Sequence, residues 1–175
     1  ERGAPRDLGR ERAAQLVVAE VEHAQAREPA DARRDRALEA VARQLDRGDV
    51  VAIALPGHGL RGPVPPSVGA LVNLRALDLA DNELRGALPA EIARCTALES
   101  LVLSGNSSHP PLALPAAIAE LRASLRTLDV AAMSLVEIPR AVTRLRLARF
   151  DADGNDALRT PPPRVARRGV PAIRE

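Results

Sequence analysis

The residue pattern that most directly suggests chemistry is a glycine-rich stretch early in the chain. Gly57, Gly59 and Gly62 fit G-x-G-x-x-G and follow the apolar run at residues 50–55. In a dinucleotide site, these glycines open a helix whose N-terminus receives the pyrophosphate. Here prolines follow at positions 63, 65 and 66, and they argue against such a helix. We therefore expect no nucleotide and no other cofactor at this stretch.

The other reactive side chains form no catalytic or metal-binding set. His23, His58 and His109 lie on different expected elements and lack the spacing of metal ligands. The single cysteine, Cys95, occupies a repeated apolar position, so we expect a core residue and not a nucleophile, and no internal disulfide. Neither a Ser-His-Asp set nor a carboxylate pair can be nominated. The sequence thus predicts no metal site, no catalytic residues and no enzyme activity.

Composition narrows the classes of partner. The 175 residues fit one domain, and 46% hydrophobic content is enough for a core, although it includes one Phe and no Trp or Tyr. All basic residues are Arg, and the net charge is +2. The basic excess is confined to residues 159–175, which hold five Arg and one Glu. We expect neither a nucleic-acid-binding face nor a membrane span in this chain.

A repeated template organises the middle of the chain. Residues 74–97 fit L-x-x-L-x-L-x-x-N-x-L followed by x-G-x-[IL]-P, and similar units begin at Val50, Leu98, Leu125 and Leu147. The chain here resembles leucine-rich repeat proteins. The resemblance implies an α/β solenoid with a short parallel β-sheet on its concave face and helical caps at both ends. We divide the chain into an N-terminal cap (1–49), five repeats (50–158) and a C-terminal capping helix or tail (159–175).

The template has a direct physical reading. Apolar residues at positions four and six of each unit make a short strand with one buried face. Asparagine at position nine can satisfy backbone groups of the turn, so His58 and Met133, which replace it, predict weaker turns at those two places. Later apolar residues three apart predict one helical turn per unit. They fall at Val68/Leu71, Ile92/Cys95, Ile118/Leu121 and Val142/Leu145.

Both flanks show helical patterns. In residues 1–49, apolar residues recur at helical spacing on either side of a break at 28–30, and Asp31 and Gly48 suit the two ends of the second helix. Residues 155–173 resemble the closing unit of intracellular leucine-rich repeat proteins, including Ras-associated plant and Roco-type GTPase families. Asp156 replaces the usual proline of that unit. The resemblance implies a terminal helix that covers the last strand.

The open face of the expected sheet is the candidate binding surface. Its outward positions hold small residues, several acids and one Arg. The candidate partner-binding residues are Asp78, Asp81, Val102, Asp129, Arg149, Asp151 and Asp153. The carboxylates could receive Arg or Lys groups of a partner, or the face could simply be a solvated surface. Asn106-Ser107-Ser108 also matches the glycosylation sequon, but we expect Asn106 to be occupied in its turn.

Taken together, the sequence predicts a monomeric, non-enzymatic module that binds a protein or peptide, with basic groups where the partner meets the acids. One alternative is a regulatory segment of a larger signalling enzyme, a GTPase or kinase, lying outside these residues. Another is a fragment of a receptor ectodomain. The paired-cysteine caps of plant receptor ectodomains are missing, and the closing unit looks intracellular. We therefore expect a cytoplasmic location, with an extracellular one left open.

Overall fold

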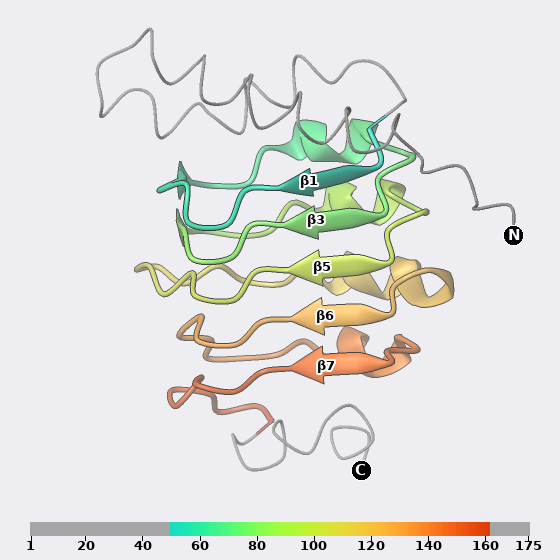
Figure 1. Ribbon diagram of the computed structural model, residues 1–175. Helices are drawn as coiled ribbons and strands as arrows, with labels where there is room; N and C mark the ends of the chain where they lie inside the picture. The colour runs from blue at the N-terminus through green and yellow to red at the C-terminus, as the bar shows by residue number, and fades with distance from the viewer. Residues whose placement is uncertain (1–49, 162–175) are drawn as a thin grey trace, which may run out of the picture.

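The computed structural model describes residues 50–161, in which each predicted repeat contributes one strand to a parallel sheet. The order in the sheet follows the order in the chain, as Figure 1 shows. The strands are β1 (Ala52–Ala54), β3 (Ala76–Asp78), β5 (Ser100–Val102), β6 (Thr127–Asp129) and β7 (Arg149–Asp151). The predicted N-terminal cap and residues 162–175 of the predicted C-terminal cap lie outside the described residues.

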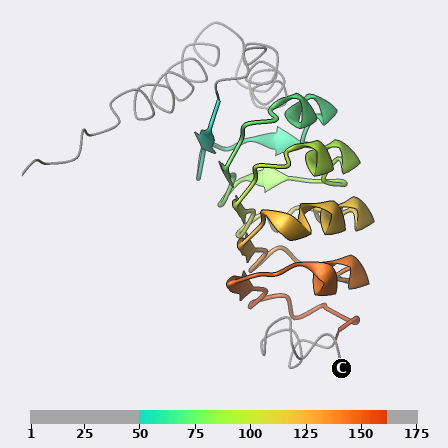
Figure 2. The same ribbon diagram turned by 90° about the vertical axis from the view of Figure 1, so that its right-hand side faces the viewer.

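A layer of short helices lies on the other side of the core from the sheet (Figure 2). These helices are η1 (Pro66–Ala70), η2 (Ala90–Arg94), η3 (Ala116–Ala123) and η4 (Arg140–Arg144). All four are 3₁₀-helices, so the predicted single helical turns are present in a tighter form than the α-helix. Between the layers, β2 (Arg61–Gly62) and β4 (Glu83–Leu84) form a second parallel pair.

The 3₁₀ geometry follows from the residues that start and line each turn. A proline precedes each helix in an extended conformation, for example Pro65 with φ −71° and ψ 145°. The backbone N–H of Val68 then donates to the Pro65 carbonyl, and that of Leu71 donates to the Val68 carbonyl, both at 3.1 Å. With three residues per turn, apolar residues three apart project to the same side. Val68 and Leu71 are both buried, as the spacing predicts.

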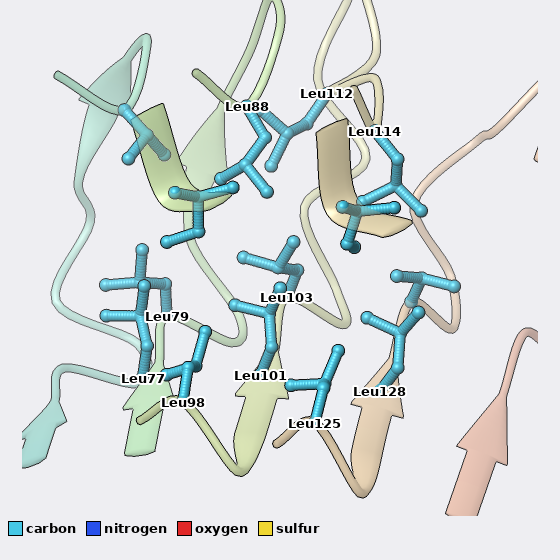
Figure 3. Close-up of a cluster of buried hydrophobic side chains, with 14 of the residues drawn as sticks. Leu77, Leu79, Leu88, Leu98, Leu101, Leu103, Leu112, Leu114, Leu125 and Leu128 are labelled. Carbon is cyan, nitrogen blue, oxygen red and sulfur yellow. The ribbon is translucent and has the colours of Figure 1, made fainter. Parts of the chain in front are cut away.

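The core is a stack of aliphatic side chains between the two layers (Figure 3). Leu77, Leu101 and Leu128 project from neighbouring strands and lie at most 2% exposed. A single repeat cannot bury such a face, because its leucines are covered by those of the repeats on each side. The last strand is less well covered within this core, since Leu147 and Phe150 are only partly buried.

The asparagines of the turns bond backbone groups of two repeats. Asn82 accepts a hydrogen bond from the Leu60 N–H and donates to the Leu55 carbonyl, and both groups belong to the preceding repeat. The turn that contains His58 is therefore braced by the next repeat. Asn155 likewise accepts hydrogen bonds from the N–H groups of Met133 and Leu135.

Each asparagine also bonds its own turn, since Asn82 donates to the Leu79 carbonyl and Asn155 to the Ala152 carbonyl. The turns of His58 and Met133 lack an asparagine of their own but are braced by the next repeat, so their relative weakness stays a prediction. The third repeat has its own Asn106 but no asparagine from the next repeat, where Met133 is buried at that position. The turn of the third repeat, residues 104–112, also carries the two-residue insertion.

Candidate functional site

The strand register sets the candidate surface as two rows of side chains on the open face. The first row runs along the third position of each repeat and contains Ala52, Ala76, Ser100, Thr127 and Arg149. The second row runs along the fifth position and contains Ala54, Asp78, Val102, Asp129 and Asp151. Neighbouring parallel strands lie ~4.8 Å apart, so successive side chains within one row are close enough to contact the same partner. The alignment of repeats made from sequence is confirmed at every strand.

The three aspartates of the second row share one local geometry. Asp78 Oδ1 accepts the Ala80 N–H at 3.0 Å, Asp129 Oδ1 accepts the Ala131 N–H at 3.1 Å, and Asp151 Oδ1 accepts the Asp153 N–H at 3.0 Å. Each bond joins residues two apart at the end of a strand. One carboxylate oxygen therefore fixes the side chain. All three residues are of intermediate exposure, so the charged groups remain in contact with solvent.

Two further candidate acids lie just beyond the strand ends. Asp81 and Asp153 are exposed, and they occupy the turns that follow β3 and β7. Asp81 has a φ of 53°, in the left-handed region. Its carboxylate lies against Gly105 in the next turn, where an added Cβ would clash with Asp81 Oδ1. The acids therefore extend over both the sheet face and its adjoining turns.

Val102 and Arg149 complete the predicted set. Val102 stands between Asp78 and Asp129 in the second row and is partly exposed. Arg149 is exposed at the end of the first row, and within residues 50–161 it forms no ion pair. The structure thus gathers the five acids, Val102 and Arg149 on one face and along its border. The net charge of these seven residues is −4, from five carboxylates and one guanidinium.

The glycine-rich stretch has a role within the repeat. Gly57, Gly59 and Gly62 have φ values of 67°, 65° and 83°, which glycine adopts without strain. The chain after Gly59 enters β2, where Arg61 pairs with Glu83, so these glycines do not open a helix. The feature required for a phosphate-binding helix N-terminus is therefore missing at this position.

Cys95 is in the core, as predicted from its apolar position. Its side chain is 0% exposed, and its Sγ donates to the Val68 carbonyl at 3.3 Å. Burial raises the pKa of the thiol to about 11, which disfavours the nucleophilic thiolate. Among residues 50–161, no group of three or more His, Cys, Asp or Glu side chains could hold a metal ion.

The sequon asparagine is also buried. Asn106 is 0% exposed, and its Nδ2 donates to the Leu79 and Leu103 carbonyls at 2.9 and 2.7 Å. Its Oδ1 accepts the Leu84 N–H at 3.0 Å. The amide that would carry a glycan is therefore fully used in the folded chain, in agreement with the sequence prediction.

Sequence reasoning missed a row of charges at the opposite edge of the sheet, where the strands begin. The second position of each repeat holds Arg75, Glu99 and Arg126 in three successive repeats, and Arg75 Nη1 lies 2.6 Å from Glu99 Oε1. A signal was available, because these residues share one template position and alternate in charge. The alternation of the strands does not reveal it, because these residues come just before the strands begin.

Comparison with known proteins agrees with the repeat architecture. The family model described as Leucine Rich Repeat matches residues 73–95. No curated protein matches the sequence. None of the helices in the described part of the chain is both long and apolar enough to cross a membrane.

Three solved structures illustrate the likeness. The LRR ectodomain of the receptor kinase SOBIR1 from Arabidopsis thaliana is 25% identical, with 68% of this chain and 62% of that chain covered and a TM-score of 0.52. The ectodomain of the Arabidopsis thaliana receptor kinase GASSHO1/SCHENGEN3, in complex with CASPARIAN STRIP INTEGRITY FACTOR 2, is 31% identical, with coverage of 60% and 12% and a TM-score of 0.51. The plant peptide hormone receptor RGFR1, in complex with RGF2, is 24% identical, with coverage of 71% and 21% and a TM-score of 0.56, and this likeness shows the fold alone.

The stacked strands, the asparagine turns, the family match and these neighbours define the class. The chain is a leucine-rich repeat protein with an α/β solenoid fold. It spans only 12–62% of the length of these three neighbours.

Proposed function

We propose that this chain is a non-enzymatic protein-interaction module that binds a protein or peptide partner on the open face of the sheet. The supporting observation is the row of three aspartates, each fixed at a strand end through one oxygen and partly exposed. Carboxylates held in this way need no reordering to receive a partner's charge, which lowers the entropic cost of binding. The similar GASSHO1/SCHENGEN3 ectodomain was solved in complex with CASPARIAN STRIP INTEGRITY FACTOR 2, which favours this class of function.

The partner that fits this face carries basic groups. Asp129 and Asp151 lie on neighbouring strands, ~4.8 Å apart along the row, while Asp78 is two strands from Asp129, roughly 10 Å away. Arg side chains can bind carboxylates through two parallel hydrogen bonds, and Lys groups can do so as point charges. Val102 offers an apolar contact between the acids. A segment that crosses the strands would therefore place basic side chains on either side of an apolar one.

Neutralising the aspartates without removing their turn bonds tests the proposal. Asn at positions 78, 129 and 151 keeps an oxygen for the backbone N–H, whereas Ala would also weaken the strand ends. We expect peptides selected from a random displayed library on the unmodified protein to be enriched in Arg and Lys. We expect their affinity to fall about tenfold or more in the triple variant Asp78→Asn, Asp129→Asn, Asp151→Asn at low salt.

A matched control carries the same change of charge on other surfaces. Glu91 and Glu120 lie on η2 and η3, across the core from the sheet, and Glu137 lies in the loop before η4. Their joint change to Gln should leave binding of the selected peptides unaltered. Equal binding by the triple-Asn variant, with its fold intact by circular dichroism, would show that the acidic row does not contact the partner.

A second candidate function is a regulatory or ligand-binding segment within a larger protein. It is favoured by the short span of this chain relative to RGFR1 and GASSHO1/SCHENGEN3, 21% and 12% of their lengths. The closing-unit resemblance favours the cytoplasmic form, as a segment regulating a GTPase or kinase, over the receptor-ectodomain form. Sequencing the reading frame around these residues distinguishes the two forms. A neighbouring nucleotide-binding or kinase domain without a membrane span supports the cytoplasmic form. A secretory leader together with a membrane span supports the receptor-ectodomain form.

We also propose that the chain is a monomer. Within residues 50–161 the exposed large hydrophobic side chains are Val72 and Val136, which are 49% and 45% exposed and belong to different repeats. Scattered single residues of this kind are normal for a monomer surface. Light scattering coupled to size-exclusion chromatography should give a mass near 18.6 kDa, and a mass of twice that value would contradict the proposal.

A further inference from the structure

An open hollow lies at the edge where the strands begin, away from the acidic strand ends. Its volume is about 330 Å³, and it is lined by Arg75, Ala97, Glu99, Ala123, Ser124 and Arg126. These residues come from the approaches to β3, β5 and β6, whose starting ends are at the right in Figure 1. Ligand pockets in proteins range from roughly 300 to 1,000 Å³, so this hollow suits a single side chain better than a large ligand.

The longer helix of the third repeat shapes one wall of this hollow. The helix η3 has eight residues, whereas each of the other three helices has five. At its end, the N–H groups of Ser124 and Leu125 both donate to the Leu121 carbonyl, at 3.1 and 2.9 Å. The extra length places Ala123 and Ser124 at the rim of the hollow. The methyl groups of Ala97 and Ala123 give it small apolar walls.

Arg126 supplies an oriented positive charge. Its Nη2 donates to the Ala123 carbonyl at 2.9 Å, and its Nη1 donates to the Leu125 carbonyl at 3.3 Å. These carbonyls are neutral, so they fix the guanidinium without cancelling its charge, and among residues 50–161 Arg126 has no acidic partner. A guanidinium has five N–H donors, so further donors remain for a ligand.

Arg75 and Glu99 form a pair that can be opened. Their side chains are 55% and 53% exposed, and Arg75 Nη1 lies 2.6 Å from Glu99 Oε1. An ion pair this exposed contributes at most about 1 kcal/mol, so a ligand can compete for Arg75 at little cost. The three ionised groups of the hollow sum to +1. Glu99 opposes a doubly charged phosphate more strongly than a singly charged carboxylate.

We propose that this hollow binds a carboxylate of a partner polypeptide, from an acidic side chain or a chain terminus. Arg126 holds one carboxylate oxygen from its fixed position, and Arg75 turns from Glu99 to the other. The apolar walls receive the short carbon chain that carries the group. This site is separate from the acidic sheet face and takes the opposite charge, so the two proposals stand or fall independently.

Titration of the ¹⁵N-labelled full chain with small carboxylates at constant ionic strength tests the site. The probes are N-acetyl-glutamate N-methylamide, which has a side-chain carboxylate, and N-acetylalanine, which has a terminal one. We expect saturable shifts of the Ser124 and Arg126 amide signals and of the Arg126 Nε–H signal. The probe that binds with the higher affinity shows whether the site prefers a side-chain or a terminal carboxylate. The glutamine analogue should give no saturable shift, and equal shifts with sodium chloride or tighter binding of methyl phosphate would overturn the proposal.

Three variants make the result specific. Arg126→Gln should weaken the carboxylate affinity about tenfold, as expected for loss of a charged hydrogen-bond donor. Arg144→Gln removes an exposed arginine at the end of η4 and should leave the affinity unchanged. Glu99→Gln removes the competing carboxylate and should strengthen binding. Unchanged affinity in both Arg126→Gln and Glu99→Gln, with the rest of the spectrum preserved, would refute the assignment.

Discussion

Replacing Asn106 with alanine should destabilise the chain more than any substitution on its surface. The Asn106 side chain is fully buried in the middle repeat and makes three hydrogen bonds to backbone groups. Its loss does not affect all three groups equally. The Leu79 carbonyl also accepts from Asn82 Nδ2 at 2.9 Å and so keeps a partner. Among the described residues, the Leu84 N–H and the Leu103 carbonyl depend on Asn106 alone.

The magnitude follows from those two groups. A buried backbone group left without a partner costs roughly 1–3 kcal/mol, so two of them predict a loss of about 2–6 kcal/mol. Typical domains have only about 5–15 kcal/mol of stability, so this loss is a large share. Asn106→Asp has nearly the same volume and keeps the acceptor for Leu84, but it turns an oxygen toward the two carbonyls. It should therefore lose a similar or larger amount, which separates hydrogen bonding from packing.

Urea unfolding followed by circular dichroism measures the effect, with the midpoint and the slope m fitted separately. Ser107→Ala serves as the control, since Ser107 is exposed beside Asn106 and its loss should change stability by less than about 0.5 kcal/mol. If Asn106→Ala loses less than about 1 kcal/mol at unchanged m, the two backbone groups must find other partners. The reasoning on turn support would then be wrong.

Three further predictions concern other positions. The chain contains no Lys or Tyr, and burial raises the pKa of Cys95 from 9.0 to about 11, so the unfolded state loses this proton first as pH rises. Stability should therefore fall by about 2–3 kcal/mol between pH 9 and 11 in urea unfolding, and Cys95→Ala should remove that fall. Ala132 has a φ of 50°, so Ala132→Gly should raise the free energy of unfolding by about 0.5–1 kcal/mol, and a loss would contradict the assigned strain. A Cβ at Gly69 would lie 2.5 Å from the Glu91 carbonyl oxygen, so Gly69→Ala should cost about 1–3 kcal/mol, seen as a lower melting temperature.

Much of the fold could be predicted from the sequence because the same spacing of apolar residues recurs in each repeat. Alternating apolar residues fix which face of a strand is buried, and a shift by one residue would expose every leucine. That constraint is why the register of Ala76, Ser100 and Thr127 was predicted correctly. The helical turns were also predicted, although their 3₁₀ form required the backbone.

The turn support could not be read in the same way. In the sequence, each asparagine is next to its own turn, and local reasoning assigned it there. In the fold, neighbouring repeats are ~4.8 Å apart, so an asparagine amide can bond backbone groups of the preceding repeat as easily as those of its own turn. Asn82 and Asn155 therefore serve the turns of the preceding repeats as well as their own.

The sequence by itself determined the repeats, the buried positions and the residue types on each row, because these depend on periodicity along one chain. Only the tertiary structure decided how repeats bond to one another. It bonded Asn82 and Asn106 to the repeats before their own, and it gathered Arg75, Glu99 and Arg126 around a hollow. The reason is that such contacts join residues more than twenty positions apart, and the stacking of repeats sets their distance.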